Sequence, residues 1–181
     1  RDSYTIPWPL FTYTNDREKE FKEVGTPWPL IVRAWGEGKQ TTRVWPFFSR
    51  SENANLKSSF YAWPIYKYRE GRSETFLSKR TTLLFFLYSN LHETNKAKQT
   101  TRRRINVWPF FQWKKTHDGR SKLQILAPLE VFLPENPSIE RNYSPLWSIW
   151  RSEANSEESS KSHSFLWNLF RYHKEGNERR W

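Results

Sequence analysis

The sequence predicts an all-β fold, built as an antiparallel up-and-down meander of about nine strands. An apolar, aromatic motif recurs along the chain, polar turn signals separate its copies, and Pro stands in most copies. Thr, Tyr, Phe, Trp and Val dominate the segments around the motif, and these residue types favour strands. A Pro inside a helix costs about 3 kcal/mol, which disfavours a helical interpretation.

The motif starts as Trp-Pro followed by apolar residues and becomes degenerate toward the C-terminus. Its nine copies are spaced 17 to 25 residues apart, at 7–11, 27–31, 45–48, 63–66, 83–86, 108–111, 127–129, 144–147 and 164–167. Such self-similarity indicates a tandem repeat of about 20 residues. Each copy is expected at the centre of an extended segment of about 11 to 17 residues.

Polar stretches rich in Gly, Asn and Asp lie between the copies and predict the chain reversals. These stretches are 15–16, 36–38, 52–55, 70–72, 92–98, 118–119, 135–137, 154–161 and 175–177. Consecutive antiparallel strands need only short hairpins, which suits one reversal per repeat.

The two faces of each predicted strand differ, because successive side chains alternate sides. In the sixth segment one face reads Ile105, Val107, Pro109, Phe111 and Trp113. Five alternate positions span about 27 Å, close to the apolar band of roughly 25 Å on outer-membrane β-barrels. The pattern therefore predicts a barrel, or part of a larger barrel or sheet array. A soluble sheet of two layers that bury their midlines against each other is the alternative.

The prolines fit this scheme least well. Pro cannot donate to a β-ladder, so its recurrence at one level predicts a line of missing hydrogen bonds across the sheet. The sheet is expected to bend or bulge along that line.

Composition excludes several kinds of chemistry. The 181 residues contain no Cys, which removes disulfides, thiolate metal sites and cysteine nucleophiles. No pair among the four His has the spacing of a helical zinc site, and no nucleophile elbow or Gly-rich phosphate loop occurs. The sequence therefore predicts a protein that is not an enzyme and uses no cofactor, metal or small-molecule substrate.

Two sets of residues are candidates for binding. An aromatic midline belt is expected at Trp8, Trp28, Trp45, Trp63, Phe85, Trp108, Trp147 and Trp167. The chain carries 30 Lys and Arg against 19 Asp and Glu, a formal net charge of +11. Basic residues that flank the sixth copy are the candidate anion-contacting groups: Arg102, Arg103, Arg104, Lys114 and Lys115.

The Trp-Pro-Phe-Phe motif, followed by a basic stretch and a Glu-Gly-Arg or Asp-Gly-Arg turn, resembles tandem aromatic repeats of uncharacterised bacterial envelope proteins. The resemblance is carried by 45–48, 63–66 with 70–72, and 108–111 with 118–120. It implies an envelope location and an array of strands, and it brings no catalytic residues.

We therefore predict a non-enzymatic structural component of a bacterial cell envelope, in the outer membrane or periplasm. It would be an outer-membrane-type β-barrel or a membrane-associated β-sheet, with lipid or other envelope subunits as partners. The alternative is a soluble β-repeat scaffold that binds a polyanion such as lipopolysaccharide or polysaccharide through basic strand ends and exposed aromatics. Nucleic acid is disfavoured as that polyanion, because the aromatics are expected at strand centres and the charges at strand ends.

Residues 1–181 are expected to form a single repeat-built β domain that is a segment of a longer array. Trp181 follows Arg179-Arg180 and lies 17 residues after Ser164, so it fits the Trp position of a tenth copy. An unpaired strand at that point would leave an exposed edge, which natural sheets avoid.

Overall fold

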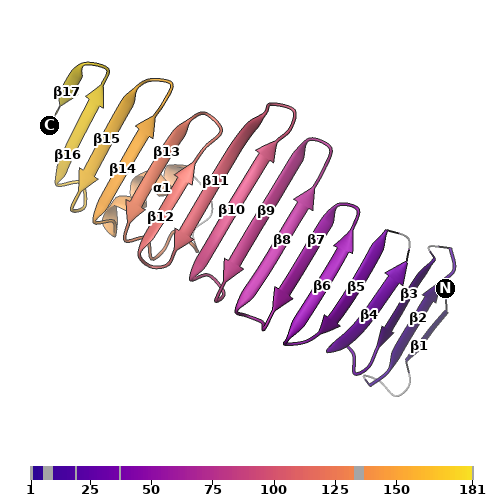
Figure 1. The fold of residues 1–181 in the computed structure, drawn as a ribbon. Helices are drawn as coiled ribbons and strands as arrows, with labels where there is room; N and C mark the ends of the chain where they lie inside the picture. Colours follow the sequence, from indigo (N-terminus) through magenta and orange to yellow (C-terminus); the bar gives the residue numbers. More distant parts are fainter. Residues whose placement is uncertain (1, 6–9, 19, 37, 133–136, 181) are drawn as a thin grey trace. The chain divides into compact units, whose positions relative to one another are not determined.

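The computed structural model describes residues 2–5, 10–18, 20–36, 38–132 and 137–180. In this part of the chain, seventeen antiparallel strands run up and down in one open sheet (Figure 1). The predicted all-β, antiparallel up-and-down meander is confirmed. The count of about nine strands is not confirmed, and the closed barrel stays a prediction.

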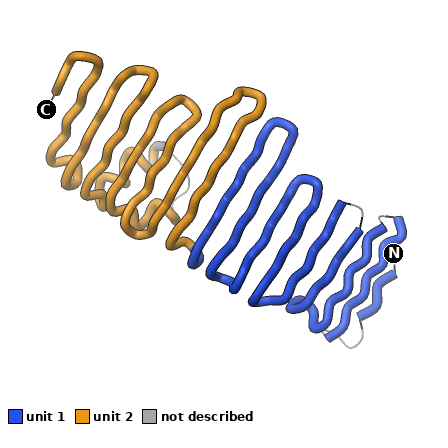
Figure 2. Tube along the Cα trace, in the orientation of Figure 1, with its two compact units in different colours: residues 1–85 blue, residues 86–181 orange. Residues whose placement is uncertain are grey.

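The first compact unit, residues 1–85 (blue in Figure 2), consists of strands that pair in chain order. Its described strands are β1 (Asp2–Thr5), β2 (Thr12–Asp16), β3 (Phe21–Gly25), β4 (Ile31–Gly36), β5 (Lys39–Val44), β6 (Phe48–Asn53), β7 (Leu56–Tyr61), β8 (Tyr66–Arg72) and β9 (Phe76–Leu83).

The second compact unit, residues 86–181 (orange in Figure 2), continues the same pattern and adds a helical insertion. Its described elements are β10 (Tyr88–Asn95), β11 (Thr100–Val107), β12 (Phe111–Lys115), β13 (Arg120–Ile125), α1 (Pro137–Tyr143), the 3₁₀ helix η1 (Ser144–Leu146), β14 (Trp150–Asn155), β15 (Ser160–Phe165), β16 (Phe170–Glu175) and β17 (Glu178–Arg180). The prediction of a single domain within a longer array stays a prediction.

The aromatic motifs form turns and not strand centres, which corrects the prediction. Turns occupy 26–30, 45–47, 62–65, 84–87, 108–110 and 166–169. Six of the long apolar segments are therefore folded into hairpins, which explains why strands outnumber motifs; most of the first copy, residues 7–9, lies outside the described residues. It also means that none of the described strands has the 27 Å apolar length expected of a barrel strand. The peptide bonds Trp45-Pro46, Trp63-Pro64 and Trp108-Pro109 are cis, a form found at tight turns.

Neighbouring turns are joined through the proline carbonyls. The backbone N–H of Trp63 donates to the carbonyl of Pro46 at 2.8 Å, and that of Phe85 donates to Pro64 at 3.3 Å. In the second unit Ala127 donates to Pro109 at 2.8 Å. Pro lacks a donor but keeps its acceptor. The predicted line of missing hydrogen bonds is thus a row of turns connected by the acceptors that Pro retains.

The seventh and eighth motif copies do not form strands either. Residues 127–129 follow β13 as an irregular segment, and 144–146 form η1, with Pro145 in its first turn. Pro suits this position because the first N–H groups of a helix have no partner within it. The described residues 126–132 and 137–149 therefore belong to a long insertion that packs over one face of the second unit.

The polar reversals agree with the sequence prediction more closely than the aromatic motifs do. Turns lie at 54–55, 96–99, 117–119, 156–159 and 176–177, inside or beside predicted reversals. The side-chain oxygen of Asn95 accepts from the N–H of Lys98 at 3.1 Å, and that of Asn155 accepts from Glu157 at 3.1 Å. These are the local bonds that favour Asn at turns. Three of the predicted stretches differ: 15–16 still belongs to β2, 70–72 still belongs to β8, and Pro137 begins α1, while 135–136 lie outside the described residues.

The core is thin. Among the described residues only four apolar side chains are buried: Val32, Ala34, Leu91 and Ala127. A single-layer sheet leaves most side chains half exposed on one face or the other. The helices in the described part of the chain are too short and polar to cross a lipid bilayer.

Candidate functional site

Large apolar side chains are exposed along one edge of each unit, which we call the aromatic edge. The outermost are Phe47, Phe110 and Leu169, with exposed fractions of 70%, 67% and 72%. In the first unit the aromatic edge consists of Trp28, Leu30, Trp45, Phe47, Trp63, Ile65, Leu84 and Phe85. In the second unit it consists of Leu87, Phe110, Trp167 and Leu169.

Ring contacts connect successive turns of the aromatic edge. The rings of Trp45 and Trp63 lie 6.1 Å apart, and those of Trp63 and Phe85 lie 5.5 Å apart, edge to face. Within the adjoining strands, Phe48 contacts Tyr61 and Tyr61 contacts Tyr66, at 5.4 and 5.8 Å. Aromatic pairs of this geometry stabilise beyond their buried area by about 0.5–1.5 kcal/mol. The exposed rings are therefore held in place and not free to collapse inward.

An apolar row follows the aromatic edge, one residue into the strands of each unit. In the first unit the register brings together Ile31, Val44, Phe48, Tyr61, Tyr66 and Leu83. In the second unit it brings together Tyr88, Val107, Phe111, Ile125, Trp150, Phe165 and Phe170. The opposite ends of the strands, which we call the polar edge, carry the Asn-, Lys- and Glu-rich hairpins.

The predicted aromatic belt is at this edge rather than at a midline. Trp28, Trp45, Trp63, Phe85, Trp108 and Trp167 all lie in the turns. Trp108 is half-buried, and its indole N–H donates to the carbonyl of Pro128 at 2.9 Å. Trp147 is an exception, because it packs within the insertion. Trp8 and Trp181 lie outside the described residues.

The five candidate anion-contacting residues divide between the two faces of the second unit. Arg103 pairs in register with Lys115 on one face, which we call the open face. Arg102, Arg104 and Lys114 point to the other, which we call the helix face because the insertion covers it. There Arg104 donates to the carbonyl of Glu130 at 2.9 Å, Lys114 contacts Glu140 at 3.1 Å, and Arg102 pairs with Glu93 at 3.6 Å. The five side chains therefore do not form one anion site.

A buried polar cluster fastens the insertion to the helix face. The carboxylate of Glu130 accepts from the indole N–H of Trp147 at 2.8 and 2.9 Å and from the side-chain amide of Gln124. Gln124 pairs in register with Gln112, and Gln112 pairs with Asn106, and all three amides are buried. Buried polar groups are mostly hydrogen-bonded, and Glu130 supplies the acceptor for both the Gln124 amide and the Trp147 indole.

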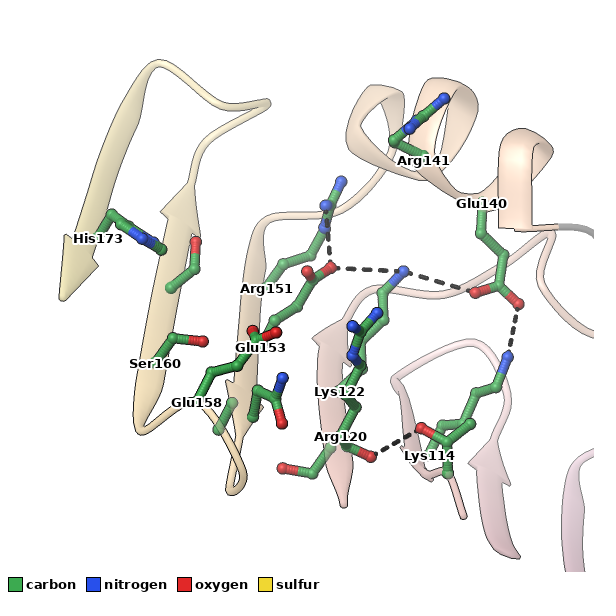
Figure 3. Close-up of a pocket in the computed structure, with 15 residues that line it drawn as sticks. Lys114, Arg120, Lys122, Glu140, Arg141, Arg151, Glu153, Glu158, Ser160 and His173 are labelled. Atoms are coloured by element: carbon green, nitrogen blue, oxygen red, sulfur yellow. Dashed lines mark hydrogen bonds and ion pairs between the residues drawn. The ribbon is translucent and has the colours of Figure 1, made fainter. Parts of the chain in front are cut away.

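A cavity of about 520 Å³ opens between α1 and strands β12–β16 on the helix face (Figure 3). Lys122 lies between two carboxylates, 3.7 Å from Glu140 of α1 and 3.8 Å from Glu153 of β14. Arg151 pairs with Glu153 at 3.3 Å. Burial lowers the pKa of Lys122, and the nearby charges of Glu153 and Glu140 oppose this only in part.

Sequence reasoning missed Lys122, Glu140, Arg151 and Glu153. The register that aligns Lys114, Lys122 and Glu153 follows from which strands pair, and the insertion between β13 and β14 hides that pairing. The only sequence signal was the alternation of side chains within β13 and β14, which places Lys122 with Gln124, and Arg151 with Glu153, on one face of their strands.

The His residues are dispersed over β10, a turn, β15 and β16. In the described ranges, His, Asp and Glu form no group of three or more that could hold a metal ion. Comparison with protein-family models, curated proteins and solved structures finds no match to this chain.

Proposed function

We propose that the protein is a non-enzymatic structural component of a bacterial cell envelope that associates with a lipid membrane through its aromatic edge. The observation that carries the proposal is the gathering of exposed Trp, Phe, Leu and Ile at one edge of each unit, opposite a polar edge. Trp and other aromatic side chains concentrate where membrane and water meet. A shallow insertion of about 5–10 Å would cover the turns and the apolar row.

The turns that lack Pro support this interpretation. Phe85 and Trp167 have φ values of 64° and 55°, in the left-handed region, and are 58% and 55% exposed. This conformation costs an L-residue roughly 1–2 kcal/mol, which Gly or Asn avoids. Large apolar residues are unfavourable in this turn conformation and more than half of their surface stays exposed, so an external apolar contact accounts for that exposed surface.

The proposal is tested with two tryptophans of nearly equal exposure at opposite edges of neighbouring strands. Trp45 is 45% exposed at the aromatic edge, and Trp35 is 41% exposed at the polar end of β4. We expect Trp45→Ser to weaken binding to phosphatidylcholine vesicles by about tenfold, because one aromatic side chain is no longer inserted into the membrane. Trp35→Ser should change it by less than about twofold. Vesicle flotation measures both.

Equal binding by the two variants would contradict insertion through the aromatic edge. Circular dichroism of each variant shows whether the sheet is retained. In bacterial cells the chain should fractionate with membranes and require detergent for extraction.

A second candidate is binding to an extracellular polyanion, and the open face of the second unit favours it. A cross-strand row on this face contains Arg103, Lys115, Lys161 and Lys174. Beside this row, Trp150 stacks on His163 at 6.1 Å, and His163 stacks on Tyr172 at 6.1 Å. Cations next to stacked rings suit a lipopolysaccharide or an acidic polysaccharide.

A further inference from the structure

The cavity on the helix face has an excess of buried positive charge. Lys114, Lys122 and Arg151 have side chains only 16%, 17% and 13% exposed, and they share two carboxylates, Glu140 and Glu153. A cation held away from water without a matching anion is costly. The arrangement is therefore one negative charge short.

The ammonium group of Lys122 also has hydrogen-bonding capacity to spare. An ammonium carries three donors, and the two carboxylates beside it lie at 3.7 and 3.8 Å, beyond hydrogen-bond distance. Figure 3 shows the side chain reaching between Glu140 and Glu153 toward the space below α1. An oxyanion placed there would bond to Lys122 and restore charge balance.

The rest of the cavity fits a tetrahedral oxyanion. Further donors line it from different strands: the hydroxyls of Ser160 and Ser162, the imidazole of His173 and the guanidinium of Arg120. In total, five basic side chains and three carboxylates line the cavity, so its formal charge is positive. A volume of about 520 Å³ admits a phosphate group with a substituent attached.

We propose that the cavity between α1 and strands β12–β16 binds a phosphate group, with Lys122 as its central ligand. The molecule that carries this phosphate group is inferred from the proposed membrane function. Lys122 lies three residues along β13 from Ile125 of the apolar row, which is about 10 Å. With the aromatic edge in the acyl boundary, Lys122 reaches the level of lipid headgroups. An anionic lipid headgroup is therefore the expected carrier of the phosphate.

The first experiment titrates the full chain with inorganic phosphate in a chloride buffer, by calorimetry. Lys122→Met should weaken phosphate affinity by about tenfold or more, as expected for losing a hydrogen bond to a charged group. Lys98→Met is the matched control, because it removes the same charge from an exposed polar hairpin, outside both the cavity and the open-face row. It should change the affinity by less than about twofold.

A second variant, with the opposite expected effect on phosphate affinity, distinguishes loss of the site from misfolding. Glu153→Gln removes a competing carboxylate, so it should tighten phosphate binding. Equal affinities of wild type and Lys122→Met, or weaker binding by a folded Glu153→Gln, would overturn the proposal. Trp45→Ser should bind inorganic phosphate with wild-type affinity. The phosphate titration therefore tests the cavity even if the proposed membrane association fails.

A second experiment identifies the source. Phosphatidic acid added to phosphatidylcholine vesicles should strengthen binding of wild type and Lys98→Met more than of Lys122→Met. That outcome assigns a lipid headgroup. Equal strengthening in all three, together with a Lys122-dependent affinity for inorganic phosphate, assigns the site to a free phosphate or a soluble phosphate ester and rejects the headgroup.

Discussion

At the scale of single residues, Glu70 shows how a thin sheet accommodates a buried charge. The residue is 6% exposed, and its carboxylate accepts from the Tyr68 hydroxyl at 2.7 Å and from Arg72 Nε at 2.6 Å. The three residues alternate along β8, so they share one face. The hydrogen bonds from Tyr68 and Arg72 lower the pKa of Glu70. Burial and the bond to Glu70 raise the pKa of Tyr68 to about 12.

We predict that Glu70→Gln lowers the free energy of unfolding at neutral pH by roughly 1–3 kcal/mol. The folded-state pKa of Glu70 lies below its ordinary value of 4.5, so its contribution is full above that pH. It disappears as pH falls through the folded-state pKa. Urea unfolding of wild type and variant at several pH values should show the difference shrinking on acidification. Glu52→Gln, at an exposed ion pair with Lys57, should cost less; an equal cost would contradict this role for Glu70.

At the scale of elements, the insertion is held by polar contacts more than by apolar burial. Glu130 is its central acceptor, and only Ala127 among its described apolar side chains is fully buried. The three-residue η1 and the seven-residue α1 are too short to be stable alone. Their helical form therefore depends on these contacts with the sheet.

Replacing Glu130 should release the insertion without disrupting the strands. We predict that Glu130→Ala lowers the free energy of unfolding by about 2–4 kcal/mol, because Trp147 and Gln124 lose a buried acceptor. Hydrogen exchange should rise across 137–146 and remain slow in β12 and β13. Glu157→Ala, in an exposed turn, is the control. Unchanged exchange in α1 of the Glu130 variant would show that other contacts hold the insertion.

At the scale of the whole molecule, the net charge of +11 favours association with any anionic surface. The open face of the second unit is expected to strengthen polyanion binding beyond the effect of net charge. Two double variants remove the same charge from cross-strand basic pairs in different units. One is Arg103→Ala with Lys115→Ala, and the other is Arg69→Ala with Arg80→Ala.

We predict that the Arg103/Lys115 variant elutes from immobilised heparin at lower salt than the Arg69/Arg80 variant. Wild type should be released steeply as salt rises, because screening shortens the range of exposed charges to about 3 Å at 1 M. Coincident elution of the two variants would leave net charge as the only cause and remove the polyanion candidate.

Part of this architecture follows from local chemistry, and the sequence alone was sufficient to predict it. Asn and Gly at the polar hairpins, β-favouring residues between them and the alternation of side chains predicted an antiparallel meander. Even the face shared by Ile105, Val107, Phe111 and Trp113 is correct, because a three-residue turn at 108–110 keeps the alternation in phase.

The tertiary structure decided what local chemistry leaves open. Hydrophobicity made the Trp-Pro motifs resemble strand centres, yet the described Trp-Pro motifs form turns at an exposed edge, because the strands on either side of each turn pair with each other in one sheet. The anion candidates Arg103 and Arg104 are adjacent in sequence but lie on opposite faces. The cavity around Lys122 requires β13 and β14 to pair across a long insertion, and such a contact depends on the folded whole rather than on neighbouring residues.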